Sequence, residues 1–76
     1  MGDAQAMNAL VPGQRVRLTG IEPKGASGTV NRVAGSGRAA WVRMDEPLPD
    51  QLRTFEPEDE RARDRMVYVD EVELIG

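Results

Sequence analysis

The chain has neither cysteine nor histidine among its 76 residues, and only one tryptophan, one tyrosine and one phenylalanine. Without thiols and imidazoles it has no disulfide framework, no zinc or haem site of the usual kind, and no nucleophile activated by histidine. It also lacks an apolar run of about 18 residues and a secretory leader pattern. We therefore expect a small cytoplasmic domain with no metal, no cofactor and no membrane association.

Charge is distributed unevenly along the chain. Residues 1–44 hold six basic residues against two acidic ones, whereas residues 45–76 hold four basic residues against eleven acidic ones. The formal net charge of −3 is therefore a poor guide to the local field. One face of the folded domain can be basic although the whole chain is acidic.

Alternation of polar and apolar residues predicts five short strands. Val30 and Val33 have opposite parity, which predicts a bulge in the second strand, and Gly35-Ser36-Gly37 predicts a tight hairpin after it. The expected strands cover residues 14–19, 27–33, 39–44, 65–70 and 71–75. The expected inward residues are Val16, Leu18, Val30, Val33, Val42, Met44, Val67, Val69, Val72 and Leu74, and Ala40 shares the parity of Val42 and Met44.

The remaining segments set the domain limits. Residues 1–10 show no apolar period and are expected to be a flexible N-terminus, so the domain is expected to cover residues 11–76. Three prolines interrupt residues 45–65, which we expect to form a long loop or, from Pro57, a short helix, with Phe55 anchoring it. Together these features predict an all-β domain, a small five-stranded barrel with one long loop or short helix before the fourth strand.

Part of the chain resembles SH3-like barrels. The residues that carry the likeness to the KOW motif of ribosomal proteins and transcription elongation factors are Val16-Arg17-Leu18-Thr19-Gly20, Lys24-Gly25 and Gly28-Thr29-Val30-Asn31-Arg32-Val33. The same stretch, continued through Trp41-Val42 and Asp45-Glu46-Pro47, is similar to the opening of CAP-Gly domains. The resemblance implies an SH3-like fold and, through the KOW motif, contact with RNA. The path from Gly20 to Lys24 is longer than in KOW motifs, and the Gly-Lys-Asn-Asp-Gly stretch of CAP-Gly domains is missing.

Exposed aromatic and arginine side chains are the first candidate site. Strand parity places them on one outward row, where they can stack on nucleic-acid bases or hold an extended peptide. Two other interpretations of the row remain open, namely an interface between subunits and a tryptophan that belongs to the core. The residues of this expected binding face are Trp41, Arg43, Met66, Tyr68, Arg15 and Arg17.

A second candidate site is a glycine-containing basic loop that could hold an anion or nucleic acid, with Lys24, Gly25, Gly28 and Arg32 as its residues. The carboxylates are interpreted as solvated charge, because they lack the spacing of a calcium loop or of an acid and base pair. We find no catalytic residue and no metal ligand set.

These observations predict a non-catalytic binding module that holds a protein partner or a second copy of itself. The alternative is a KOW-like domain that binds RNA or single-stranded nucleic acid. A remote alternative is an oligomeric barrel enzyme resembling type II dihydrofolate reductase. In that family a Val-Gln-Ile-Tyr strand builds the pore, and Met66-Val67-Tyr68-Val69 lies in the analogous place without matching it.

Overall fold

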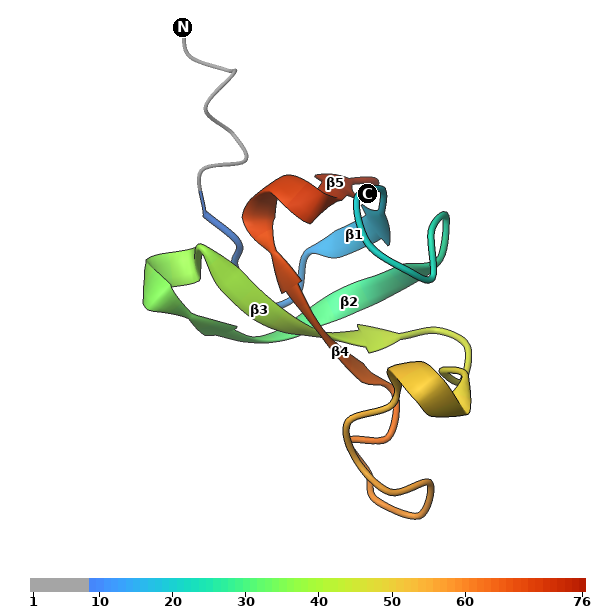
Figure 1. The fold of residues 1–76 in the computed structure, drawn as a ribbon. Helices are drawn as coiled ribbons and strands as arrows, with labels where there is room; N and C mark the ends of the chain where they lie inside the picture. The colour runs from blue at the N-terminus through green and yellow to red at the C-terminus, as the bar shows by residue number, and fades with distance from the viewer. Residues whose placement is uncertain (1–8) are drawn as a thin grey trace, which may run out of the picture.

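Five strands form one antiparallel sheet in the computed structural model of the chain, which describes residues 9–76. They are β1 (Arg15–Leu18), β2 (Ser27–Ala34), β3 (Ala39–Met44), β4 (Asp64–Tyr68) and β5 (Val72–Leu74), arranged in the order β4-β3-β2-β1-β5 (Figure 1). The expectation of an all-β fold with five strands is confirmed. The N-terminal segment that the sequence predicts to be flexible lies, up to residue 8, outside the described residues.

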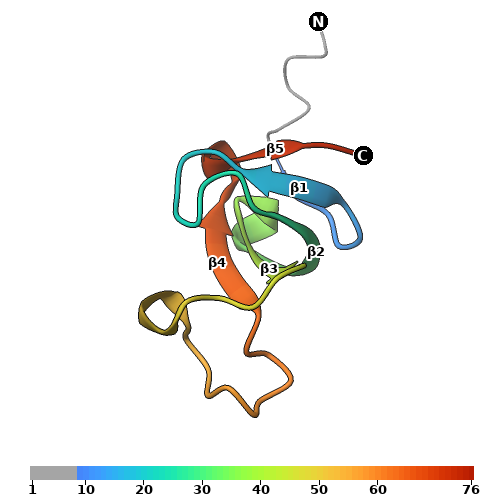
Figure 2. The ribbon, with the colours of Figure 1, turned by 90° about the vertical axis from the view of Figure 1, so that its right-hand side faces the viewer.

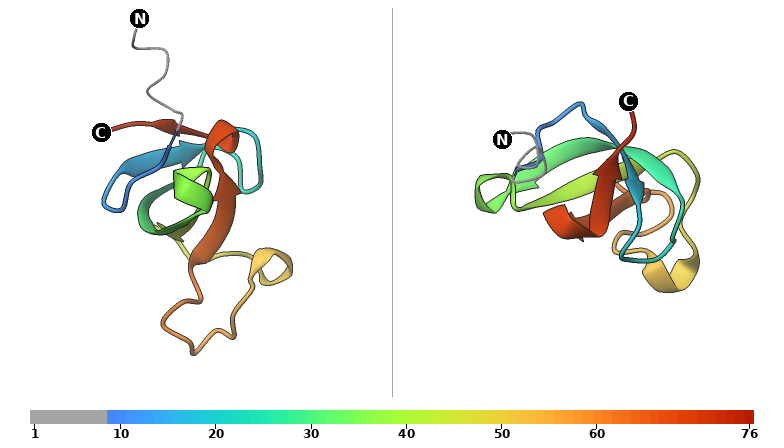
Figure 3. Two further views of the ribbon diagram at one scale, coloured as in Figure 1. Left: turned by 90° about the vertical axis from the view of Figure 1, so that its left-hand side faces the viewer. Right: turned by 90° about the horizontal axis from the view of Figure 1, so that it is seen from above.

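The sheet curls because its longest strand takes part in both halves. Strand β2 pairs with β1 at residues 27–29 and with β3 between residues 28 and 34, so the sheet bends around its concave side (Figure 2). Strands β4 and β5 are the two ends of the strand order and are linked in sequence by the 3₁₀ turn η4 (Val69–Glu71) (Figure 3). The sheet is not closed by pairing between them.

The predicted bulge in the second strand is present. The register of β2 against β3 shifts between Val30, which lies opposite Val42, and Arg32, which lies opposite Trp41. The extra residue turns Arg32 away from the core side, which its parity with Val30 would otherwise assign to it. The hairpin from β2 to β3 is the turn η2 (Gly35–Gly37), whose three residues all have positive φ.

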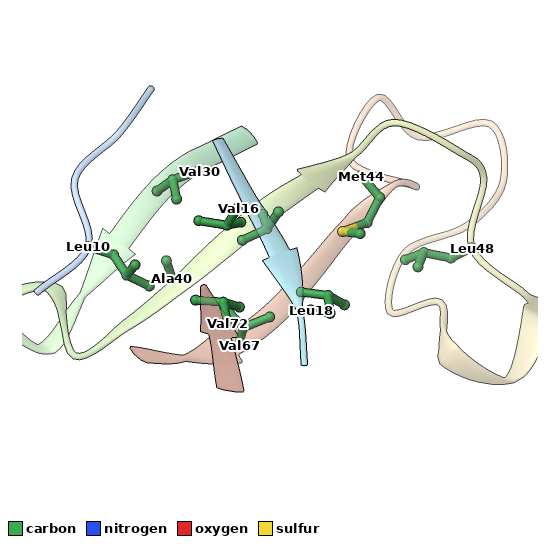
Figure 4. Close-up of a cluster of buried hydrophobic side chains, with 10 residues drawn as sticks. Leu10, Val16, Leu18, Val30, Ala40, Met44, Leu48, Val67 and Val72 are labelled. Carbon is green, nitrogen blue, oxygen red and sulfur yellow. The ribbon is translucent and has the colours of Figure 1, made fainter. Parts of the chain in front are cut away.

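The core lies on the concave side of the sheet (Figure 4). Most of the expected inward residues are buried there, and Val69 is partly buried against them. Two expectations are wrong: Val33 is 39% exposed and Leu74 is 42% exposed. Val33 lies where β2 is paired only with β3, and Leu74 lies on the edge strand β5, so each lacks a neighbouring strand on one side. Two core residues were not predicted, Leu10 and Leu48.

The segment between β3 and β4 is a loop with one short 3₁₀ turn, η3 (Asp50–Leu52). The helix considered from Pro57 onward is not formed, and turns occupy that stretch instead. Leu48 packs into the core, and the amide of Met44 donates to the carbonyl of Arg63 over 2.9 Å, which closes the base of the loop. Strand β4 ends at Tyr68, two residues earlier than predicted. Within residues 9–76, no helix has the length and apolar character needed to cross a membrane.

Candidate functional site

The convex side of the sheet carries two aromatic residues in adjacent cross-strand rows. Arg32 of β2, Trp41 of β3 and Met66 of β4 lie opposite one another, and Tyr68 lies one row away, opposite Ala39. Side chains opposite one another on antiparallel strands share a face and lie close enough to interact. We call Arg32, Trp41, Met66 and Tyr68 the aromatic–arginine face. Arg32 is exposed, Tyr68 is 58% exposed, and Trp41 and Met66 are partly buried.

The next row across the sheet is an ion-paired ladder rather than a free basic surface. Arg15, Thr29, Arg43 and Asp64 lie opposite one another on four successive strands. The guanidinium of Arg43 donates from Nε and Nη2 to the two carboxylate oxygens of Asp64, over 2.7 and 3.1 Å. Asp64 is only 3% exposed. These hydrogen bonds raise the pKa of Arg43 above its usual value.

The two arginines of β1 are engaged in the same way. Arg15 donates from Nη1 and Nη2 to the carboxylate of Asp45, over 2.8 and 2.7 Å, and Nη1 also donates to Thr29 Oγ1 over 3.0 Å. The hydrogen bonds lower the pKa of Asp45 and raise that of Arg15. Arg17 pairs with Glu73 over 2.8 Å. Three of the cations expected to offer charge to a ligand therefore already have carboxylate partners.

Residues of the long loop cover part of the aromatic–arginine face. The rings of Trp41 and Phe55 lie 5.5 Å apart between centroids, tilted by 55°. The guanidinium of Arg61 lies 4.2 Å above the ring of Phe55, on which it makes a cation–π contact. Asp59 accepts from the backbone N–H of Arg61 and from its Nε and Nη2, over 2.8, 3.0 and 3.0 Å. We call residues 54–61 the strap. The expectation that Phe55 anchors the loop is confirmed.

Acid is expected to loosen the strap before it unfolds the sheet. The bonds from Arg61 lower the pKa of Asp59 from 3.8 to about 2. The folded state therefore keeps this carboxylate charged at a pH where an unfolded chain protonates it, and the resulting stabilisation is complete above pH ~4 and lost as the pH falls through ~2. We expect the emission of Trp41, the only tryptophan, to change over this range while circular dichroism still reports the sheet.

Two variants check the origin of that change. Asp59→Asn should give the acid-type emission already at neutral pH, whereas Glu58→Gln, one position away and exposed, should titrate like the parent chain. An emission that stays constant until the sheet itself unfolds would show that Asp59 does not hold the strap against Trp41.

The glycines of the second candidate site have structural tasks in this fold. The amide of Gly25, a residue with φ of +84°, donates to the carbonyl of Leu18 over 2.8 Å, so that N–H is not free for an anion. Gly28 is buried in β2 against β3. Lys24 is exposed in the loop between β1 and β2, whereas Arg32 lies on the convex face beside Trp41. The structure therefore does not bring these four residues together into one anion-binding loop.

A shallow depression lies beside Tyr68. Arg38, Tyr68, Val69, Asp70 and Glu71 line it, and its volume is about 460 Å³. Glu71 Oε1 accepts from the amide of Tyr68 over 2.8 Å, which commits one of the two acidic groups to the turn η4. Arg38 is exposed and forms no ion pair with another residue of the 9–76 range. The depression therefore places the guanidinium of Arg38 and the carboxylates of Asp70 and Glu71 at the Tyr68 end of the aromatic–arginine face.

Sequence reasoning placed Trp41, Met66 and Tyr68 on one face, and the structure brings them together with Arg32. It missed the contribution of Arg61, whose only sequence signal is its closeness to the single phenylalanine. It also missed Arg38. No group of three carboxylates within residues 9–76 is arranged to hold a metal ion.

Comparison with known proteins gives no assignment: no family model, no curated protein and no solved structure matches the chain.

Proposed function

We propose that the protein is a non-catalytic, cytoplasmic binding module with an SH3-like barrel fold, and that it holds a protein partner through the aromatic–arginine face. The open curled sheet, with a long bent β2 and a 3₁₀ turn before β5, supports the barrel part of this proposal. The binding part rests on the surface chemistry of the convex side.

The observation that carries the proposal is that some arginines on the convex side of the sheet are held in ion pairs and others are not. Arg15, Arg17 and Arg43 are held in ion pairs, so the ladder offers little net charge to a phosphate backbone. Beside it, Trp41, Met66 and Tyr68 present apolar and aromatic area together with Arg32, which forms no ion pair with another of residues 9–76. Aromatic residues, methionine and arginine are the types enriched at protein interfaces, whereas nucleic-acid binding depends on several free cations.

A peptide-library selection tests this function directly. The library is panned on the parent chain and, in parallel, on the double variant Arg32→Ser/Tyr68→Ser, whose replaced side chains are both exposed. We expect peptides that enrich only on the parent chain. Val11→Ser/Leu74→Ser is the matched control, because it also removes two exposed side chains but leaves the convex face intact.

Two outcomes would contradict the proposal. Enrichment that is equal on the parent chain and on the face variant would show that the aromatic–arginine face is not the binding site. Quenching of Trp41 by a mixed-sequence single-stranded oligonucleotide, lost steeply between low and physiological salt, would instead support the KOW-like alternative. Sedimentation over a dilution series separates self-association from binding of another protein.

A further inference from the structure

The strap supplies a ligand-like group to the proposed binding face from within the same chain. Phe55 occupies one side of Trp41, at a ring distance typical of favourable aromatic pairs. The residues that follow Phe55 are strongly acidic: Glu56, Glu58, Asp59 and Glu60. The face therefore already accommodates an aromatic side chain, and in the chain that side chain is followed by carboxylates.

Charge on the face matches that chemistry. Glu60 of the strap adds to the negative field that raises the pKa of Arg43. Beyond the strap, Arg32 lies opposite Trp41, and Arg38 lines the depression beside Tyr68; both are exposed and have no ion-pair partner among residues 9–76. Carboxylates that extend from Trp41 toward these guanidinium groups would form charge-assisted hydrogen bonds.

The strap is joined to the rest of the chain at its two ends: Arg53 Nε donates to the carbonyl of Phe55 over 3.0 Å, and the amide of Asp64 donates to the carbonyl of Arg61 over 2.9 Å. Its residues Glu56, Pro57, Glu58 and Glu60 are exposed, and Phe55 packs on Trp41. Leu48 and the Met44–Arg63 hydrogen bond hold the loop outside the strap. The strap can therefore leave Trp41 while the base of the loop stays in place.

We propose that the strap is an internal competitor for the partner, and that the partner presents an extended segment with an aromatic residue followed by carboxylates, which displaces Phe55 from Trp41 and pairs with Arg32 and Arg38. This inference rests on the proposed function and specifies the partner's chemistry. A binding site open in only a fraction of molecules binds its ligand more weakly by that fraction. A strap closed in about 90–99% of molecules lowers the apparent affinity about 10- to 100-fold.

The probe is a synthetic peptide with the sequence of residues 54–60, Thr-Phe-Glu-Pro-Glu-Asp-Glu, titrated into the full chain while the emission of Trp41 is followed. The peptide contains no tryptophan, so the signal comes from the protein alone. Phe55→Ser vacates the site, and we expect it to bind the peptide about ten-fold or more tightly than the parent chain does. Arg61→Ser removes the cation above Phe55 and should raise the affinity in the same direction. Val11→Ser, which changes an exposed residue outside the strap and the face, is the control and should behave like the parent chain.

Peptide variants test whether the protein recognises the aromatic residue and the carboxylates of the peptide. Replacing the phenylalanine of the peptide by serine, or its four carboxylates by lysine, should abolish binding to Phe55→Ser. The double variant Phe55→Ser/Arg32→Ser should bind the original peptide more weakly than Phe55→Ser alone. Circular dichroism of each variant establishes that the sheet is retained.

Equal affinity of Phe55→Ser and the parent chain for the peptide would overturn the proposal, as would equal binding of the lysine peptide. Its failure is distinguishable from failure of the proposed function. Library peptides that depend on Arg32 and Tyr68 but are basic or purely apolar would leave the binding face in place and refute the strap as a mimic. Library peptides independent of those residues would refute the binding face itself.

Discussion

Gly28→Ala is expected to cost about 3 kcal/mol of folding free energy, at the upper end for an overpacked interior. A Cβ at this position would lie 2.6 Å from the carbonyl oxygen of Arg43, 2.7 Å from Val42 Cγ1 and 3.0 Å from the Cα of Met44. Two of these three atoms belong to the backbone of β3, so rotation of a side chain cannot relieve the clash. Strands β2 and β3 would have to separate where both are covered by the core.

The measurement is the thermal midpoint, which in a domain of this size falls by about 4–8 °C for each kcal/mol, so a loss of roughly 12–24 °C is expected. Gly13→Ala is the control: Gly13 has φ of +96° but open space around its Cβ position, so its replacement costs only backbone strain. A Gly28→Ala chain as stable as the Gly13→Ala chain would contradict the close approach of the two strands.

Asp64→Ala is expected to have the second largest effect, about 1.5–3 kcal/mol, the range for hydrogen bonds to charged groups. The carboxylate is buried while the guanidinium of Arg43 is partly exposed, so the loss comes from the two charge-assisted hydrogen bonds between them. Water can still reach Arg43, which keeps the cost below that of a fully buried unpaired charge.

Asp45→Ala is the comparison, because the Asp45–Arg15 pair is also joined by two hydrogen bonds from guanidinium to carboxylate but is exposed on both sides. Exposed pairs contribute little to stability, because water screens the attraction between the charges. Urea unfolding of the two variants should therefore give a clearly larger loss for Asp64→Ala. Equal losses would show that burial of Asp64 does not set the strength of its pair.

The sheet was largely predictable from local patterns, because alternation and glycine turns are short-range signals. The bulge between Val30 and Arg32 followed from parity alone. Burial at the sheet margins did not, because it depends on which strands lie beside each other. Val33 and Leu74 are apolar residues at sites with one neighbouring strand. Leu10 is held beside the core because its amide donates a hydrogen bond to the carbonyl of Gly37.

The candidate site was predictable only in part for a related reason. Parity put Trp41 and Met66 on one face, but the partners of Arg15, Arg17 and Arg43 lie 30, 56 and 21 residues away in sequence. No local pattern distinguishes an arginine bound to such a distant carboxylate from a free one. The same holds for Arg61, whose place above Phe55 depends on how the whole strap folds back.

The closed base of the long loop between β3 and β4 affects which changes in sequence length this domain can tolerate during evolution. Since the amide of Met44 and the carbonyl of Arg63 meet at 2.9 Å, the chain leaves and re-enters the sheet at nearly one point. Doubling the length of such an excursion costs only about 0.6 kcal/mol of closure entropy. Insertions beyond Leu48 in this segment therefore leave the strands and the core undisturbed, and descendants of this chain can acquire new specificities there while inheriting the same scaffold.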